Sequence, residues 1–404
     1  MVAFALLRDR SGIVQVTLKK GSTDPALFAA FAALSRESLI EVEGTVRASA
    51  RALQGVEVQP DRLTVVSPAE IPLPLGVVDK VNVELDTRLN HRVIDLRKPE
   101  VRRVFELRAA VLAALRAAYT ARGFIEVETP KLLRQGAEGG STLFAVQYFE
   151  EKAYLAQSPQ LYKQMLMGAG FERVFEIAPA FRAEPSDTVR HLTEFTSLDA
   201  EMAYIDGAED LQRTLEEVVR DSLADLKRRL ASEENPLEER IPVGKTPFPR
   251  VPFRECVERL GRPGTETDLS TEEEKRLGEL LEPERGNPFY FITDFPSETK
   301  RTTFYARRMD SDPTLTGYFD LAYRGLELAS GGPREHRLEP LLANLAAAGL
   351  SAAQFPGYLE AFRFGMPTHG GWGFGVDRFV QRLAELSNIR ESRLFPRDRY
   401  RLDP

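Results

Sequence analysis

Three closely spaced prolines, Pro68, Pro72 and Pro74, divide the 404-residue chain into a short first part and a long second part. Proline fixes its own backbone φ and donates no backbone hydrogen bond, so such a stretch is typical of a linker. A chain of this length is also expected to form two or three domains. We therefore expect a small domain over residues 1–66, a linker over 67–98 and a large domain over 99–404.

The composition excludes several kinds of protein. With 43% hydrophobic residues the chain can bury a large core, so a disordered or fibrous protein is excluded. Its one cysteine, Cys256, excludes a disulfide framework and a cysteine-built zinc site, and fits the reducing cytoplasm. No run approaches the ~20 apolar residues of a membrane span, and the chain does not start like a signal peptide. We expect a cytoplasmic protein with no membrane partner. The net charge of −7 argues against a protein that binds nucleic acid over its whole surface, so RNA could bind only at a local basic patch.

The pattern of the first 66 residues predicts short strands with one inserted helix. Two β-rich runs flank the turn sequence DRSG at residues 9–12, which is typical of a hairpin. This order of elements fits a small β-barrel. The expected strands are Ala3–Arg8, Ile13–Leu18, Ser38–Ala48 and Gly55–Val66, and the expected helix is Pro25–Leu34.

The long second part mixes helical and strand-like segments without a regular βα repeat. This pattern predicts an α+β fold, a mostly antiparallel sheet with helices packed on it. A long amphipathic helix is expected over Pro99–Arg122, because Pro99 suits a first turn and Gly123 a C-cap. Charged helices with solvated faces are expected over Glu209–Leu230 and Thr271–Leu281, and strands over Phe289–Phe295, Arg301–Ala306 and Tyr318–Ser330.

A glycine run, Gly370–Gly375, precedes an expected helix over Val376–Leu386. It lacks the third glycine of a Rossmann fingerprint, and no Walker loop is found elsewhere in the chain. Such a backbone can approach a ligand closely, beside a helix N-terminus and Arg378. A tight packing turn is an equally good explanation for the run taken alone.

Two further segments place polar side chains on one face of a strand. Residues 175–204 predict a strand, a loop and a second strand, with Arg182 and Glu184 on one face and Ser197, Asp199 and Glu201 on another. Arginine with several carboxylates could hold a triphosphate and its metals, whereas a solvent-facing hairpin with ion pairs is the common alternative.

In residues 325–334, alternation places Glu327 opposite two leucines, and Ser330 needs a bulge or a strand end to share its face. Gln160 and Lys163 lie one turn apart on an expected helix that begins near Pro159. Each of these side chains alone could be an ordinary surface residue.

Together, the order and spacing of these motifs resemble the class II aminoacyl-tRNA synthetases. Gly123–Pro130 (GFIEVETP) resembles motif 1, Phe181–Glu184 motif 2 and Gly371–Arg378 motif 3. The stretches LDTRLNHRVIDLR, AEGGSTLF, YLAQSPQLYKQMLM, RHLTEF, GLELASGG and LFPRDRYRLDP most closely resemble the aspartyl-tRNA synthetases of the archaeal type.

The resemblance implies an OB-fold anticodon domain and a class II catalytic domain in a homodimer. It implies the partners ATP, L-aspartate and tRNA-Asp, with Mg²⁺ as cofactor, and leaves tRNA-Asn open as a second acceptor. The enzyme would form aspartyl-adenylate, release pyrophosphate and transfer aspartate to the 3′ end of the tRNA. An asparaginyl-tRNA synthetase is the main alternative; an aspartate-amidating synthetase and an inactive tRNA-binding paralogue fit the sequence less well.

The resemblance also assigns residues to ATP. Arg182 would be catalytic, bridging the amino-acid carboxylate and the α-phosphate. Glu184 and His191 would face the outer phosphates, Phe195 and Arg378 would enclose the adenine, and Glu327 with Ser330 would hold Mg²⁺. Motif 3 would add Gly375, Val376 and Asp377 to the ATP site.

For aspartate, the resemblance implies ammonium contacts from Glu138 and Asp199, and positioning by Gln160 with Ser330. Lys163 and Arg334 would bind the side-chain carboxylate. A cation at position 163 suits a carboxylate better than an amide, which favours aspartate over asparagine.

Three remaining residues lie outside this pocket. Phe4 would stack on an anticodon base and Gln15 would bond to one, although the family's first barrel strand is missing from this sequence. Pro130 would lie at the homodimer interface. Pro333 stands where the family more often has glutamine, which is a second departure from its pattern.

Overall fold

The computed structural model describes residues 1–52, 54–78, 81–135, 143–183, 188–232, 235–242, 247–265 and 267–403. The chain forms two compact units, Met1–Asn82 and Val83–Pro404. None of the described helices is long and apolar enough to cross a membrane.

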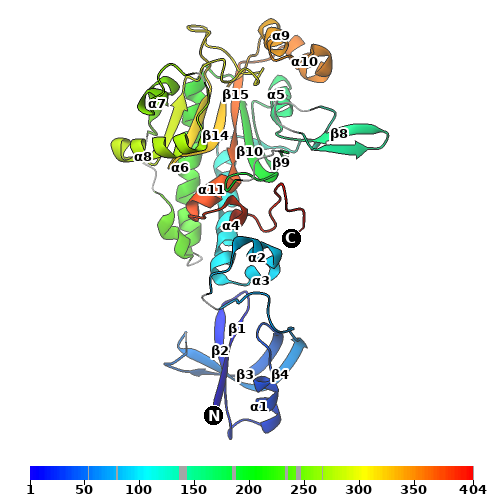
Figure 1. The fold of residues 1–404 in the computed structure, drawn as a ribbon, viewed down its shortest axis with the longest axis vertical. Helices are drawn as coiled ribbons and strands as arrows, with labels where there is room; N and C mark the ends of the chain where they lie inside the picture. Colours follow the sequence, from blue (N-terminus) through cyan, green and yellow to red (C-terminus); the bar gives the residue numbers. More distant parts are fainter. Residues whose placement is uncertain are drawn as a thin grey trace. The chain divides into compact units, whose positions relative to one another are not determined.

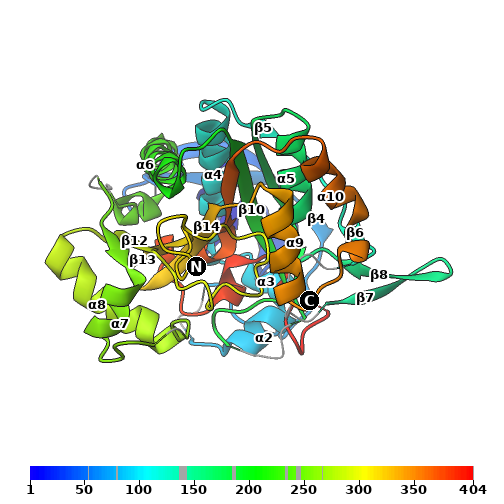
Figure 2. The ribbon, with the colours of Figure 1, turned by 90° about the horizontal axis from the view of Figure 1, so that it is seen from above.

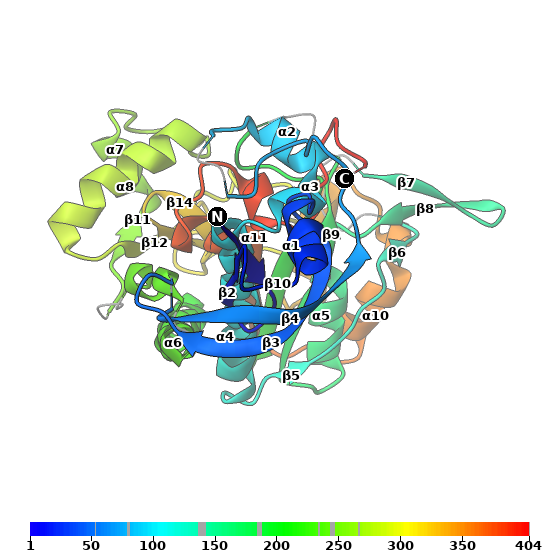
Figure 3. The same ribbon diagram turned by 90° about the horizontal axis from the view of Figure 1, so that it is seen from below.

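The first unit is a four-stranded sheet, in the order β1-β2-β4-β3, with one helix. Val16 and Leu18 of the sheet pack with Phe31 of the helix to form its small core. Asp24 caps that helix by accepting a hydrogen bond from the Leu27 amide at 2.9 Å. Figure 3 shows the long, curved strands β3 and β4 of this unit. The expected strands and helix are confirmed as β1 (Val2–Arg8), β2 (Ile13–Lys19), α1 (Pro25–Ala32), β3 (Leu39–Ala48) and β4 (Val56–Ser67).

The second unit is built on an eight-stranded sheet in the order β11-β12-β13-β14-β15-β10-β9-β5. All neighbouring strands run antiparallel except the two outer pairs, β11 with β12 and β5 with β9. The predicted α+β fold with a mostly antiparallel sheet is confirmed (Figure 1). The strands are β5 (Ile125–Glu126), β9 (Arg173–Phe181), β10 (Glu194–Ala203), β11 (Arg250–Pro252), β12 (Phe289–Thr293), β13 (Phe319–Tyr323), β14 (Leu326–Pro333) and β15 (His369–Gly375).

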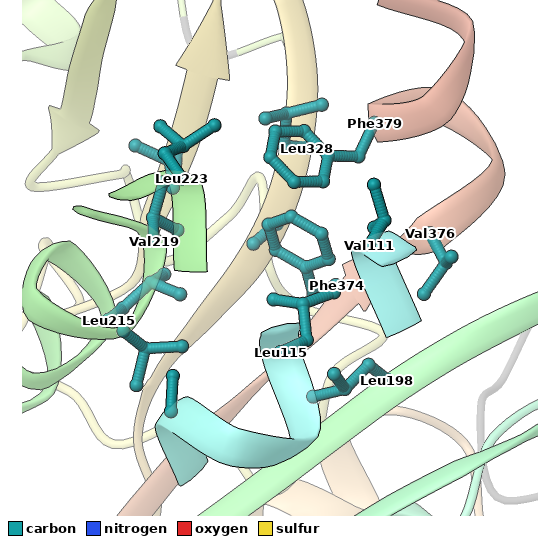
Figure 4. Packing of buried hydrophobic residues seen from close by; sticks show 14 of the residues in the cluster. Val111, Leu115, Leu198, Leu215, Val219, Leu223, Leu328, Phe374, Val376 and Phe379 are labelled. Carbon is teal, nitrogen blue, oxygen red and sulfur yellow. The ribbon is translucent and has the colours of Figure 1, made fainter. Parts of the chain in front are cut away.

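Helices α4 (Pro99–Thr120) and α6 (Ala208–Ser232) lie side by side over one face of this sheet (Figure 2). Apolar side chains of both helices, among them Leu115 and Val219, join Leu198 and Phe374 in one buried cluster (Figure 4). The charged helix expected near residue 209 thus has a solvated side and a fully buried side, which contains Leu215.

The other face of the sheet packs against a second buried cluster. It includes residues of five helices: α5 (Gln160–Gly168), α7 (Phe253–Arg259), α8 (Thr271–Arg285), α9 (Leu338–Ala347) and α10 (Pro356–Arg363). Helix α11 (Val376–Leu383) packs instead in the cluster that contains α4 and α6.

The remaining elements are the short helices η1 (Pro236–Arg240), η2 (Ala352–Gln354) and η3 (Ile389–Ser392), and a small sheet of β6 (Leu132–Leu133), β7 (Ala145–Tyr148) and β8 (Glu151–Leu155).

Two strand predictions are wrong. Residues 301–306 form turns, and only Ala306 makes an isolated bridge, to Arg334. Residues 318–330 form two strands rather than one, because the chain reverses at Arg324 and Gly325. Both of these residues have positive φ, 48° and 68°, which is the geometry of a tight hairpin turn. The continuous apolar pattern on both sides of the turn hid it in the sequence.

The expected linker, 67–98, also needs correction. Its last part folds into helices α2 (Leu85–Asn90) and α3 (Arg92–Asp95), which belong to the second unit. Arg92 forms a buried ion pair with Asp95 at 2.7 Å and donates to the Leu394 carbonyl at 2.9 Å. Because such a partner lies about 300 positions away, local sequence could not reveal that this segment is anchored.

Candidate active site

A cavity of about 430 Å³ lies on the second unit, over the sheet face opposite α4 and α6. Alternation along β10 creates this division, since Leu198 and Ala200 enter the core beneath those helices while Asp199 points the other way. The predicted site residues that line the cavity are Gln160, Arg182, His191, Phe195, Asp199, Glu327, Ser330, Arg334, Gly375, Asp377 and Arg378.

Other predicted residues do not line it. Lys163 is buried behind the cavity wall, and Val376 is buried in the core. Glu138 and Glu184 lie outside the described residues.

The floor of the cavity is a row of residues across three neighbouring strands. Ser330 pairs with Gly373, and Gly373 pairs with Asp199, so the side chains of Ser330 and Asp199 stand on one face with bare backbone between them. The glycine run is therefore a strand, so the explanation as a tight turn is wrong, while close approach to a ligand stays a prediction. Gly373 opens the floor, whereas a Cβ at Gly371 would lie 2.0 Å from the Ala200 carbonyl oxygen.

The predicted bulge before Ser330 is confirmed. The register of β13 against β14 shifts, so Ala322 pairs with Glu327 while Asp320 pairs with Ser330. Because Asp320 and Ala322 share one face of β13, Glu327 and Ser330 also come to one face. Both line the cavity.

One end of the cavity carries arginines and an aromatic ring. The guanidinium carbon of Arg182 lies 5.4 Å from the centre of the Phe195 ring. Arg378 donates to the Glu327 carbonyl at 3.1 Å, and its Nη1 lies 3.4 Å from Glu327 Oε1. His191 Nδ1 lies 2.6 Å from Thr188 Oγ1.

Asp377 has a structural task at this end. Its Oδ1 accepts from Arg108 of α4 at 2.5 Å, and its Oδ2 accepts from the Thr196 amide at 2.6 Å. It therefore ties α11 to α4 and β10.

Acidic side chains gather beside Glu327, and the sequence analysis missed them. Burial raises the pKa of Asp320 to about 7, with Lys300 opposing the rise and Glu327 adding to it. Burial and the charge of Glu327 raise the pKa of Glu274, on α8, to about 8. Among the described residues no three acidic, histidine or cysteine side chains form a metal-binding group by themselves.

The other end of the cavity holds two buried ion pairs. Arg334 Nε donates to Glu201 Oε1 at 2.9 Å, and Lys163 Nζ donates to Asp199 Oδ2 at 3.0 Å. Lys163 also lies 3.4 Å from Glu201 Oε2, so the two cations and two anions form one network. Burial alone would raise the pKa of Glu201, but the charges of Arg334 and Lys163 hold it below its usual range.

Several residues of the cavity lining, and Glu201 buried behind it, were not assigned a role from the sequence. Glu201 was expected only to share the Asp199 face, and its position two residues from Asp199 was the one available signal. Lys300, Tyr305 and Tyr318 also line the cavity. They come from the 300–318 region, where the strand prediction was wrong.

The three predicted residues of the anticodon and dimer surfaces lie elsewhere. Phe4, on β1, is 69% exposed. The Gln15 side chain donates to Thr17 Oγ1 at 3.0 Å and to Glu57 Oε2 at 3.2 Å. Pro130 is exposed and follows β5.

Residues 84–399 match the family of tRNA synthetases class II (D, K and N), and residues 1–66 match the OB-fold nucleic acid binding domain. The aspartate–tRNA(Asp/Asn) ligase of Methanopyrus kandleri is 48% identical, covering 100% of this chain and 92% of the relative. The aspartate–tRNA(Asp) ligase of Thermococcus kodakarensis is 45% identical with the same coverage.

Solved structures agree with this relationship. The asparaginyl-tRNA synthetase of Pyrococcus horikoshii complexed with asparaginyl-adenylate has a TM-score of 0.87 at 31% identity, covering 99% of this chain and 92% of that one. The aspartyl-tRNA synthetase of Entamoeba histolytica has a TM-score of 0.86 at 31% identity, covering 100% and 86%. The chain therefore belongs to the class II aminoacyl-tRNA synthetases, in the family of the aspartate–tRNA ligases.

Proposed function

We propose that this protein activates L-aspartate with ATP and transfers the aspartyl group to the 3′ end of tRNA-Asp. The observation that carries the proposal is a single cavity with two chemically different ends. One end has Arg182 and Arg378 near an aromatic ring, as a nucleotide requires, and the other has the buried cation Arg334. A molecule that joins an adenylate to an amino acid with an anionic side chain fits both ends.

The first chemical step needs alignment rather than an activated side chain. The α-carboxylate of aspartate is already ionised at neutral pH, so it can attack the α-phosphate without a general base. Arg182 lies beside Phe195 and would neutralise charge that grows on the α-phosphate. Phe195 and Arg378 would hold the adenine, and His191 would face the outer phosphates.

Class II synthetases generally use ATP with a divalent metal, and the residues of this cavity fit Mg²⁺. Glu327 and Ser330 share one strand face, and Asp320 Oδ1 beside them is buried without a hydrogen-bond partner among the described residues. Magnesium usually binds one or two carboxylates and completes its shell with phosphates and water, so three such oxygens suffice. When bound, the metal supplies positive charge to the phosphates.

Aspartate would lie over the floor at the opposite end, where Asp199 would receive its ammonium group. Arg334 uses four of its five N–H groups on Glu201, Tyr318 and Gln160, and one hydrogen of Nη1 has no partner among the described residues. We assign this N–H to the side-chain carboxylate of the substrate. Lys163 would act through Asp199 and Glu201, because it is buried against both.

The tRNA is the second substrate. We propose that the first unit holds the anticodon, with Phe4 stacking on one base and Gln15 bonding to another. We also propose a cytoplasmic homodimer with Pro130 at its interface. The relatives include ligases for tRNA(Asp) and for tRNA(Asp/Asn), so tRNA-Asn is the open second acceptor.

The experiment is ATP–pyrophosphate exchange with aspartate and with asparagine, followed by aspartylation of purified tRNA-Asp and tRNA-Asn side by side. We expect exchange with aspartate and charging of tRNA-Asp. Exchange driven by asparagine instead would select the asparaginyl alternative, which the similarity to solved asparaginyl enzymes keeps open. No exchange with either amino acid would contradict the proposal.

A further inference from the structure

A row of buried hydrogen bonds runs behind the cavity wall and ends at Arg334. His369 Nδ1 lies 2.8 Å from the Pro367 carbonyl oxygen, and His369 Nε2 lies 3.0 Å from Gln164 Nε2. Gln160 Nε2 lies 2.9 Å from Gln164 Oε1, and Arg334 Nη2 lies 3.4 Å from Gln160 Oε1. These contacts join β15, α5 and the end of β14.

The direction of every bond in this row is fixed by its two ends. The Pro367 carbonyl can only accept, so His369 Nδ1 must carry the proton. In the neutral ring Nε2 then only accepts, which turns the NH₂ group of Gln164 toward it. The oxygen of Gln164 consequently faces the NH₂ group of Gln160, and the oxygen of Gln160 faces Arg334, which can only donate.

Burial keeps the row dry and the ring neutral. His369 is 1% exposed, Gln164 is 0% exposed and Gln160 is 4% exposed. Burial lowers the pKa of His369 to about 4; the nearby charge of Glu201 opposes this shift, and that of Arg334 adds to it. A proton on Nε2 would face the NH₂ group of Gln164 and break the row.

A side branch reinforces the middle of the row. The Tyr358 hydroxyl of α10 donates to Gln164 Oε1 at 3.3 Å, so this oxygen accepts two hydrogen bonds. Neither His369 nor Gln164 lines the cavity, whereas Gln160 and Arg334 both do. The two hidden residues therefore act on the cavity only through the two that line it.

We propose that His369 and Gln164 are positioning residues, which fix the Gln160 amide with its oxygen toward Arg334 and so hold the Arg334 guanidinium ready for the substrate carboxylate. This role rests on the proposed function. A reversed Gln160 amide would set its NH₂ group against the guanidinium, donor against donor, and Arg334 would lose one of its three anchors.

The first test reads the histidine directly and needs no activity. The chain has four histidines, so protein labelled with ¹⁵N-histidine gives few signals, and His369→Gln identifies the one to follow. We expect His369 to be neutral and protonated on Nδ1, unchanged from pH 8 to pH 6. A ring protonated on Nε2, or on both nitrogens at pH 7, would overturn the proposal.

The second test measures pyrophosphate exchange with His369→Leu and Gln164→Leu. Loss of one hydrogen bond to a charged group should raise the KM for aspartate about tenfold, while kcat and the KM for ATP stay within about twofold. His369→Gln should restore the KM, because its side-chain oxygen can accept near the place of Nε2. Tyr358→Phe, a mild change that keeps the ring, should raise the KM about twofold.

The control is Gln381→Leu, which removes a buried glutamine of α11 that lies outside the row. It should leave the KM for aspartate unchanged. An unchanged KM in Gln164→Leu, or an equal change in kcat and both KM values, would overturn the positioning role. If wild-type protein shows no aspartate-dependent exchange, the proposed function fails. The ¹⁵N spectrum would still test the row of hydrogen bonds, because it reports the protonation of His369 without any activity.

Discussion

The two ends of the cavity differ in how their charged side chains are paired. At the amino-acid end, the cations Lys163 and Arg334 already face the carboxylates Asp199 and Glu201 at 2.9–3.4 Å. At the nucleotide end, acids crowd one another, and burial raises the pKa of Asp320 to about 7 and that of Glu274 to about 8. The first end is balanced by its own ion pairs, whereas at the second burial and neighbouring carboxylates favour the protonated form of Asp320 and Glu274, although Arg190 lies 3.1 Å from Glu274.

This difference suggests what each end is built for. A network of paired ions stays rigid in a dry pocket. It can therefore select a small amino acid through the few hydrogen-bond donors that the network itself does not use. Crowded acids favour a protein that completes its electrostatics only when a metal and a triphosphate arrive. The following substitutions test whether the two ends differ in this way.

The largest effect is expected from Lys163→Met at the balanced end. Removing one partner of a buried ion pair typically costs about 3–5 kcal/mol, because the remaining charge is left without compensation. We expect this loss in the free energy of unfolding, measured with urea. The exposed-pair control Lys227→Met, on α6, should lose no more than ~1 kcal/mol. Equal losses in the two variants would show that Lys163 does not hold the network together.

Arg182→Ala tests the proposed catalytic arginine of the nucleotide end. Loss of one preorganised donor to developing charge typically lowers the rate by ~10²–10³, so pyrophosphate exchange should fall by that factor. Arg254→Ala, whose side chain is 88% exposed on α7, should exchange normally. Exchange by Arg182→Ala within tenfold of wild type would remove Arg182 from the mechanism.

Glu327→Gln weakens the metal-facing donors of the nucleotide end. Because an amide oxygen carries no net charge, half-maximal exchange should need about tenfold more Mg²⁺. The matched change Glu258→Gln, on the exposed side of α7, should leave the Mg²⁺ requirement as it is. An unchanged requirement in Glu327→Gln would argue against the proposed metal position.

A further change concerns the dependence of stability on pH. The folded protein keeps a proton on Glu274 up to about pH 8, while the ordinary carboxyl value is 4.5. Between these values the folded state binds the extra proton, so this group lowers stability as pH rises. Glu274→Gln should therefore gain stability relative to wild type on going from pH 5 to pH 8. Glu272→Gln, an exposed neighbour on the same helix, should show no such gain.

Local pattern was sufficient for much of the fold and for the polar faces beside the cavity floor, although it did not predict that Gly370–Gly375 belongs to a strand. The alternation along β10 placed Asp199 correctly, and the need for a bulge between Glu327 and Ser330 followed from their spacing alone. These features depend on strand period, which a sequence shows directly.

What escaped prediction depends on partners far away in the chain. Glu201 was not recognised as the counterion of Arg334, which lies 133 residues away. His369 meets Gln164 across 205 residues, so no spacing could connect them. Lys163 was expected to bind the substrate carboxylate, which stays a prediction, but its ion pairs with the buried Asp199 and Glu201 were not expected. Tertiary electrostatics, rather than local propensity, decided these positions.

A crystal structure with the stable analogue 5′-O-[N-(L-aspartyl)sulfamoyl]adenosine tests the two-ended cavity most directly. We expect the adenine between Phe195 and Arg378, the sulfamoyl group at Arg182 and the aspartyl carboxylate on the free N–H of Arg334. A carboxylate bound away from Arg334, or an adenine outside the Phe195 end, would contradict it.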